Sequence, residues 1–240
     1  MTITPYGDSA ILINFEQRID EKINAEVIAM SNAITSELAE DVKFCIPAYC
    51  SITIGFDPVQ IKYKDIVDKI NSLYLNLTVN PEKSKSRIIH IPVCYEGGFA
   101  VDKTDVLIQT NLSWSKIIEL HTSRVYRVYM IGFIAGFAYM GTLSQALACN
   151  RKESPKMNIP SGSVGIAGLQ TGIYPVKAHA GWQLIGRTPI TVFDVKMKNP
   201  FLFHAGDRVQ FSAIDPEMYA SILANIESGN FDNKSVITYV

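Results

Sequence analysis

The sequence predicts an α+β domain over residues 1–84, followed by a mainly β domain over residues 85–240 that includes a C-terminal helix. In the first part, strand-like segments alternate with two stretches that carry apolar residues at helical spacing. A polar, proline-containing segment, NPEKSKSR, covers residues 80–87 and is typical of a linker. After residue 126, glycine and proline separate short apolar segments, and six glycines fall within residues 159–189, a density that predicts tight turns and a binding site.

Each element of the first domain follows from its apolar spacing. Residues 9–15, SAILINF, alternate in the manner of a strand. Asp20 is a favourable N-cap for a helix whose apolar face consists of Ile23, Val27, Met30, Ile34 and Leu38. Two strand-like segments, 45–49 and 51–56, precede a second helix with an apolar face of Ile66, Ile70, Leu73 and Leu77. This order indicates two helices on one face of an antiparallel sheet.

The second domain begins with a strand from Arg87 to Val93 and continues with two short helices. Asp102 and Ser113 have the side chains that favour N-cap positions, so we expect the helices to begin after them. From Tyr126 onward, the pattern is one of short strands and turns.

The last part of the chain combines strands with a final helix. We expect a turn at Gly206-Asp207 to separate a strand at residues 190–192 from one at residues 209–213. Asp215 followed by Pro216 predicts the start of a helix, and a glycine at position 229 predicts its end.

Composition argues against several classes of function. The net charge is −1, so no strong field attracts nucleic acid. The four cysteines form no C-x-x-C pair and no histidine lies at metal-ligand spacing, which favours buried or free thiols over a disulfide set or a metal site. With no secretory-type leader pattern, these features predict a cytoplasmic protein.

An uncharged stretch from Val128 to Asn150 resembles a membrane span at first sight. Its mostly apolar part is about sixteen residues, which is short of the roughly twenty that a helical span requires. We therefore expect no membrane insertion, and interpret the stretch as a buried strand that leads into a ligand-facing loop.

Several segments together resemble one protein family. They are HTSRVYRVYMIGFIAGFAYMG at 121–141, PSGSVGIAGLQTGIYP at 160–175 and GWQLIGRTP at 181–189, with PYGDSA, IPVCY and AGDRV elsewhere. This chain is similar to the family of 5-oxoprolinase B subunits, a carboxyltransferase domain family also described as allophanate hydrolase subunit 1 and, for one branch, as histidine kinase inhibitors. The resemblance implies a cyclophilin-like barrel in residues 85–240.

The chain departs from the family pattern at three places. Ala135 stands where the family usually has proline, and Asn150-Arg151 and Pro155-Lys156 stand where it has two Pro-Arg pairs. His179-Ala180 replaces the usual Pro-Gly before Gly181. Losing a proline frees φ, so we expect the loop at Ala135 to be less rigid than in relatives. These changes concern the ligand or partner and not the fold.

Two residues are candidates for catalysis. His121 lies near the end of a predicted helix, where its imidazole could carry a proton, or could instead be a structural histidine or a helix-terminal cation. Arg187 lies between Gly186 and Thr188, and its planar guanidinium could bind a carboxylate or a phosphate. Alternatively, it could form an ion pair that stabilises the barrel.

Further residues are candidates for binding. Gln170 and Thr171 offer an amide and a hydroxyl in an expected turn, where they could pair with a lactam or simply stabilise the turn. Ser163 and Tyr174 belong to the same segment and are expected to contact substrate, although Ser163 lacks the sequence context of a nucleophile. Aromatic residues are expected to line a groove or to form core: Tyr129, Phe133, Phe137, Tyr139 and Trp182.

The resemblance implies a component of an ATP-dependent 5-oxoprolinase, which opens 5-oxo-L-proline to L-glutamate after ATP-driven phosphorylation of the lactam oxygen. The implied partners are the A subunit of that enzyme and a homologue of its C subunit. No phosphate-binding loop or dinucleotide fingerprint occurs in the sequence, so at least part of the ATP site is expected in a partner, and the chain alone is expected to be inactive.

Two other functions remain open. One is an inhibitor that docks aromatic side chains on a sensor histidine kinase, which the loss of proline at position 135 weakens. The other is an allophanate hydrolase-like subunit.

Overall fold

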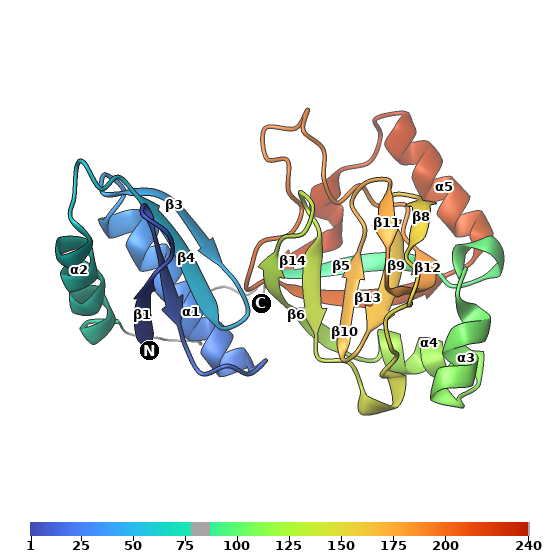
Figure 1. Ribbon diagram of the computed structural model, residues 1–240. Helices are drawn as coiled ribbons and strands as arrows, with labels where there is room; N and C mark the ends of the chain where they lie inside the picture. Colours follow the sequence, from blue (N-terminus) through green and yellow to red (C-terminus); the bar gives the residue numbers. More distant parts are fainter. Residues whose placement is uncertain (78–86, 240) are drawn as a thin grey trace. The chain divides into compact units, whose positions relative to one another are not determined.

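The computed structural model describes residues 1–77 and 87–239, apart from the side chains of residues 233 and 234. The chain divides into two compact units, Met1–Ser84 and Lys85–Val240 (Figure 1). The predicted linker lies outside the described residues except for Arg87, which begins a strand. Independent folding of each unit stays a prediction.

The first unit is an antiparallel sheet with two helices. Its elements are β1 (Thr2–Pro5), β2 (Ala10–Asn14), α1 (Glu21–Glu37), β3 (Val42–Pro47), β4 (Ser51–Phe56) and α2 (Tyr63–Leu75), and the strand order is β1-β2-β4-β3. Strand β1 was not expected, because its short TITP segment has no apolar alternation and is mostly exposed. It pairs along β2 and forms one edge of the sheet.

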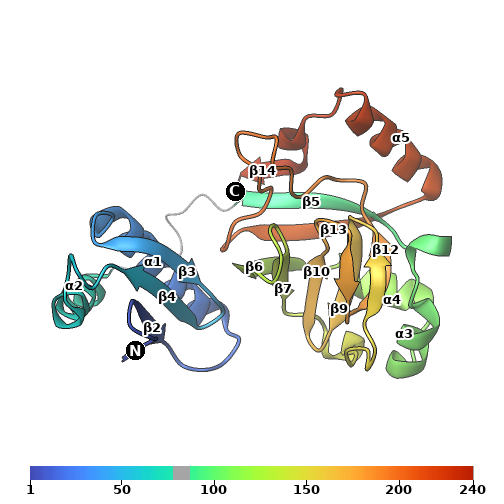
Figure 2. The same cartoon turned by 45° about the horizontal axis from the view of Figure 1, so that its top comes forward.

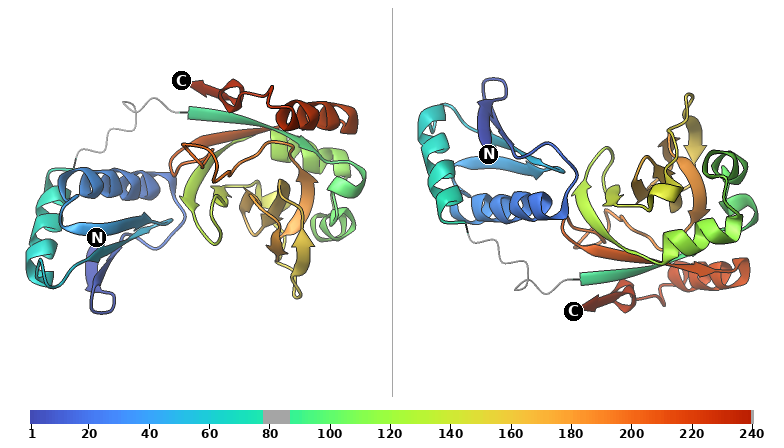
Figure 3. Two further views of the ribbon diagram at one scale, coloured as in Figure 1. Left: turned by 90° about the horizontal axis from the view of Figure 1, so that it is seen from above. Right: turned by 90° about the horizontal axis from the view of Figure 1, so that it is seen from below.

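Side chains from both helices and from the sheet form one core, as the apolar spacing predicted. Ile11 from β2, Val27 from α1 and Ile70 from α2 are all fully buried in it. Asp20 caps α1, since its carboxylate accepts hydrogen bonds from two backbone N–H groups of the first turn. Figure 3 shows α1 along the sheet, with α2 beside it.

The second unit is built on a closed barrel of seven strands, which fits the cyclophilin-like expectation. In sheet order they are β12 (Gln183–Arg187), β9 (Ser163–Ala167), β10 (Gln170–Ile173), β7 (Ala138–Gly141), β6 (Val125–Ile131), β13 (Arg208–Ile214) and β5 (Arg87–Cys94). Pairing of Arg187 with Cys94 closes the ring. Strand β14 (Ile237–Tyr239) pairs with the other end of β5, and β5 and β13 run parallel (Figure 2).

The remaining elements lie outside the barrel ring. They are α3 (Lys103–Thr110), α4 (Trp114–Thr122), α5 (Pro216–Glu227), the short strands β8 (Lys156–Ile159) and β11 (Ala178–Ala180), and 3₁₀ turns at Gly97–Phe99, Gln145–Leu147 and Asn233–Val236. The predicted caps Ser113 and Asp215 each accept a hydrogen bond from a first-turn N–H. Asp102 precedes α3 but makes no such bond, because its carboxylate is engaged elsewhere.

One predicted hairpin was wrong. Residues 190–192 form no regular strand, and only β13 follows the Gly206-Asp207 turn. The preceding loop satisfies its backbone locally: Leu202 N–H donates to Val192 C=O at 3.0 Å, and Asp207 Oδ2 accepts the His204 N–H at 2.7 Å.

The apolar segment from 128 to 150 supplies β6, β7 and the turn after them, with Ala138 and Met140 buried in the barrel core. Across residues 1–77 and 87–239, no helix is long and apolar enough to cross a membrane.

Candidate functional site

Strand alternation in the barrel separates an inner core from a second cluster on the outer face. Val164 and Ile166 of β9 and Ile173 of β10 point into the core. Residues from β7 to β12 and from the ends of these strands form a second cluster, the outer aromatic cluster. It consists of Phe137, Ile159, Ala167, Tyr174, Ala180, Trp182 and Leu184. The outer aromatic cluster thus brings together residues that the sequence places far apart.

Phe137 is the centre of this cluster. Its ring makes edge contacts with Tyr139, Tyr174 and Trp182 at centroid distances of 4.8, 5.0 and 5.4 Å. Phe137, Tyr174 and Trp182 are only 1%, 2% and 5% exposed. The expected groove residues Phe137 and Trp182 and the expected substrate contact Tyr174 are therefore packed against one another, and Tyr139 is partly exposed at their edge.

Glycines in the underlying strands make room for these rings. A Cβ at position 172 would lie 2.9 Å from Phe137 Cζ, and one at position 165 would lie 3.1 Å from Trp182 Cβ. The sequence predicted that these glycines mark a binding site. Close packing of the rings explains part of their density instead.

The other two aromatic candidates lie at different depths. Tyr129 is 1% exposed, and its ring covers the outward side of Gly141. Phe133 is 66% exposed at the tip of the β6–β7 loop, with φ of 67° and its ring centroid 5.9 Å from that of Phe137.

His121 is fully buried between α4 and the barrel. Its Nδ1 lies 2.7 Å from the Tyr95 hydroxyl and its Nε2 lies 2.9 Å from Thr171 Oγ1. Because Thr171 donates to Gly165 C=O at 3.1 Å, its oxygen accepts from Nε2–H, and Tyr95 then donates to Nδ1. Burial lowers the imidazole pKa to about 3, so His121 is neutral and ties the end of α4 to β10.

Gln170 and Thr171 lie in β10 rather than in a turn, so they cannot present their side chains to one ligand on the same face. Thr171 is fully buried and contacts His121. Gln170 is partly exposed and pairs with Gly141 and Ala167, which places it on the outer face beside the outer aromatic cluster.

Arg187 and Ser163 pair with each other near the closing contact of the barrel. Arg187 Nε–H donates to Ser161 C=O at 2.9 Å, and within the described part of the chain its guanidinium forms no salt bridge to a carboxylate. Burial raises the pKa of the Tyr219 phenol, and the Arg187 charge opposes that shift. Ser163 is 4% exposed, and its hydroxyl donates to Pro160 C=O at 2.7 Å.

Sequence reasoning missed a charged group beside the outer aromatic cluster. Arg151 is exposed, and its charge acts on the phenols of Tyr139 and Tyr174. Burial raises both phenol pKa values, that of Tyr174 to about 12, and the arginine opposes the rise. The only sequence signal for this residue is its place in one of the segments that depart from the family's Pro-Arg pairs.

A buried ion cluster adjoins Arg151 and was also missed. Asp102 is 3% exposed, and its Oδ1 lies 2.8 Å from Lys152 Nζ and 2.6 Å from Lys156 Nζ, so it pairs with both ammonium groups. Its Oδ2 accepts the Leu184 N–H at 2.8 Å. The cluster anchors the segment around residues 152–156 to α3 and β12.

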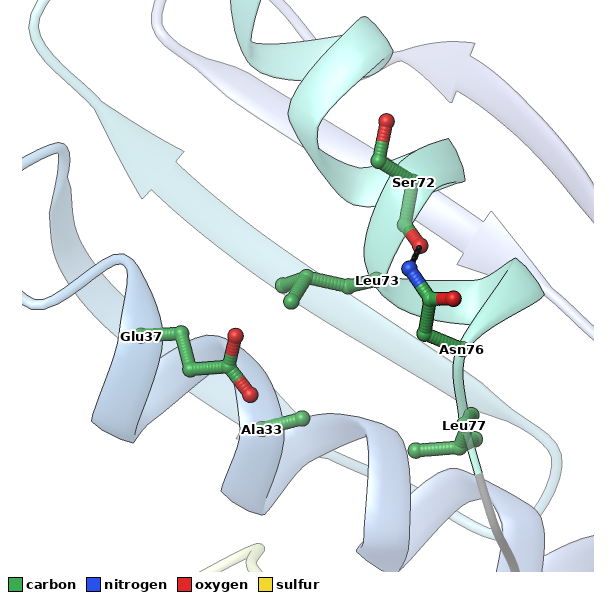
Figure 4. Close-up of a pocket in the computed structure, with 6 residues that line it drawn as sticks. All are labelled: Ala33, Glu37, Ser72, Leu73, Asn76 and Leu77. Atoms are coloured by element: carbon green, nitrogen blue, oxygen red, sulfur yellow. Dashed lines mark hydrogen bonds between the residues drawn. The ribbon is translucent and has the colours of Figure 1, made fainter.

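A hollow in the first unit lies between the ends of α1 and α2 (Figure 4). Its lining contains one carboxylate, that of Glu37, together with Ser72, Asn76 and three apolar side chains. None of the predicted site residues lines it.

The comparisons place the chain among known proteins. A model of the carboxyltransferase domain, subdomain C and D, matches residues 1–203. The chain is 39% identical over 227 residues to the protein of Bacillus subtilis (strain 168) that is named as the B subunit of 5-oxoprolinase, covering 90% of this chain and 94% of the relative.

Solved structures give a consistent result. The crystal structure of TTHA0988 superposes with a TM-score of 0.76 at 29% identity, over 86% of this chain and 40% of that one. The urea carboxylase of Kluyveromyces lactis has a TM-score of 0.80 at 18% identity, over 99% of this chain and 23% of that one, which shows a shared fold. The chain therefore belongs to the carboxyltransferase domain family, subdomain C and D, in the branch of the 5-oxoprolinase B subunits.

Proposed function

We propose that this chain is the B subunit of an ATP-dependent 5-oxoprolinase, which opens 5-oxo-L-proline to L-glutamate together with the A subunit of that enzyme and a homologue of its C subunit. The observation that carries the proposal is the 39% identity to the Bacillus subtilis protein named as a B subunit, over nearly the full length of both chains. ATP and the two partner subunits follow from the resemblance to the family.

The geometry supports separate roles for the outer-face residues. Along β9, Ser163 pairs with Arg187 and Ala167 pairs with Gln170. Four residues of strand span about 13 Å, which favours contacts with different groups. In the proposal, the Gln170 amide pairs with the lactam, and the Arg187 guanidinium holds a more distant anionic group such as a phosphate of ATP.

His121 suits a positioning role better than a proton-carrying one. Its imidazole is fully buried, and both ring nitrogens have hydroxyl partners. Through Thr171 it holds β10, the strand on which Gln170 lies.

The test is reconstitution. The chain is co-expressed with its genomic neighbours and purified, and glutamate formation from 5-oxoproline is measured with and without ATP. We expect turnover only with the full assembly and ATP, and none from this chain alone. An assembly that forms but releases no glutamate, or equal activity of the chain alone, contradicts the proposal.

One observation favours a second candidate, a kinase inhibitor. Phe133 is 66% exposed on a loop whose ends are joined by a hydrogen bond from Gly132 N–H to Phe137 C=O at 3.1 Å, so it could anchor a partner protein. Inhibition of the autophosphorylation of a genomically adjacent sensor kinase, abolished by Phe133→Ala, would favour this alternative.

A further inference from the structure

We propose that Arg151 forms a binding site for a small organic carboxylate on the outer face of the barrel, beside Gly181 and Tyr139. That the acid is 5-oxoproline rests on the proposed function, whereas the site itself rests on the geometry below.

The two lysines that follow Arg151 in this segment form ion pairs, whereas Arg151 forms none with the residues that the structure describes. Lys152 pairs with Asp102 and Asp105, and Lys156 pairs with Asp102. Among residues 1–77 and 87–239, Arg151 forms no ion pair. Its guanidinium charge is therefore not neutralised by a described carboxylate and can attract an anionic ligand.

The backbone around Arg151 is held on both sides. Gly168 N–H donates to Cys149 C=O at 2.6 Å, which joins this segment to the turn that precedes Gln170. On the other side, Lys152 N–H donates to Gly181 C=O at 2.8 Å. An arginine between two anchored neighbours loses less freedom on binding than one in a mobile loop.

The guanidinium itself crosses Gly181. The position of a Cβ on that glycine lies 3.4 Å from Arg151 Nη2, 3.6 Å from Nε and 3.9 Å from Cζ. Three such similar distances mean that the guanidinium packs over the bare glycine backbone. From there, its charge acts on the phenols of Tyr139 and Tyr174.

The groups near this cation suit a small cyclic acid. A guanidinium fork binds a carboxylate through two parallel hydrogen bonds. Tyr139 of β7 pairs with Gly172 of β10, so its ring lies on the outer face over a residue that has no side chain. The rings of Tyr139 and of the outer aromatic cluster offer an apolar wall.

The test is direct binding to the purified full chain, measured by calorimetry or by ligand-observed NMR. Three ligands are compared: 5-oxo-L-proline, 2-pyrrolidinone, which has the lactam without the carboxylate, and cyclopentanecarboxylate, which has the carboxylate without the lactam. The variants are Arg151→Gln, Arg151→Lys and, as a matched control, Arg124→Gln, which changes another exposed arginine of the same unit.

We expect Arg151→Gln to weaken binding of both acids by about 10- to 100-fold, as for a lost charged hydrogen-bond pair, without changing binding of 2-pyrrolidinone. Arg151→Lys should keep the charge, lose the fork and fall in between, and it serves as the test if the glutamine variant does not fold. Arg124→Gln should bind as the unmodified chain does.

Unchanged acid binding in both Arg151 variants, or no acid binding by the unmodified chain at millimolar concentration, overturns the site. Acid binding that depends on Arg151, in a chain whose assembly makes no glutamate, supports the site and refutes the proposed function. An active assembly whose KM for 5-oxoproline is the same with Arg151→Lys contradicts the site and leaves the function standing.

Discussion

Acidification should destabilise the second unit through His121. Burial lowers its folded-state pKa from 6.5 to about 3. Below pH 6.5 the unfolded chain binds a proton that the folded chain does not, so stability is full above that pH and falls as the pH drops toward 3. Between pH 7.5 and pH 5 this one group should cost about 2 kcal/mol of the free energy of unfolding.

The assay is urea unfolding followed by tryptophan fluorescence at several pH values. Trp114 and Trp182, the two tryptophans of the chain, both lie in the second unit, so the signal reports that unit. His121→Gln removes the titrating group and keeps a donor that can reach Thr171. We expect this variant to be less stable near pH 7.5, because the Tyr95 hydroxyl loses its acceptor, and to lose about 2 kcal/mol less than the unmodified chain on going to pH 5.

A matched control changes another barrel histidine that has a hydroxyl partner. His90 lies 3.0 Å from Thr238 Oγ1, and His90→Gln leaves His121 in place. The control should therefore keep the contribution of His121 to the pH dependence. If the unmodified chain and His121→Gln lose the same free energy between pH 7.5 and pH 5, the reasoning about the buried imidazole is refuted.

Three further substitutions test the packing, the ion cluster and the proposed anion contact. Asp102→Asn should cost about 3 kcal/mol of unfolding free energy in urea titrations, because it leaves two ammonium groups beside a neutral side chain, whereas Asp105→Asn at the half-exposed rim should have a much smaller effect. Gly172→Ala should cost about 1–3 kcal/mol by the same assay, since its Cβ would meet Ala138 O at 2.8 Å, while Gly98→Ala, with no atom within 4 Å, should change little. Arg187→Lys should lower kcat/KM of the assembled enzyme, with a loss of about 2–3 kcal/mol of transition-state stabilisation, and should change Tm little. A large fall in Tm with unchanged activity per folded molecule would assign Arg187 a structural role.

The sequence predicted helix N-caps where the capping hydrogen bond joins residues that are close together in the chain. Asp20, Ser113 and Asp215 cap their helices because the cap accepts from an N–H two or three residues ahead. Asp102 has the same local signal but no cap bond. Its carboxylate binds Lys156 and the Leu184 N–H, and neither partner can be read from a short window of sequence.

The division of the candidate site between two faces also escaped prediction. Gln170 and Thr171 are adjacent in sequence, yet strand geometry sends one to the outer face and the other to His121 in the core. The glycine-rich series of short strands was predicted correctly. We interpreted the glycines of residues 159–189 as features of a binding site, whereas some of them make room for aromatic rings. The rings that need those glycines come from segments on either side, and only their packing identifies the reason.

Periodicity, caps and motifs in the sequence predicted the family, both helices of the first unit and, in the second unit, strands β5 and β13, because these are short-range or directly comparable properties. Three features became apparent only in the folded chain: His121 is buried and neutral, Phe133 is exposed, and Arg151 lies beside Tyr139 and Tyr174. Burial and electrostatic environment depend on the register of strands and on the packing of distant segments, which no single stretch of residues encodes.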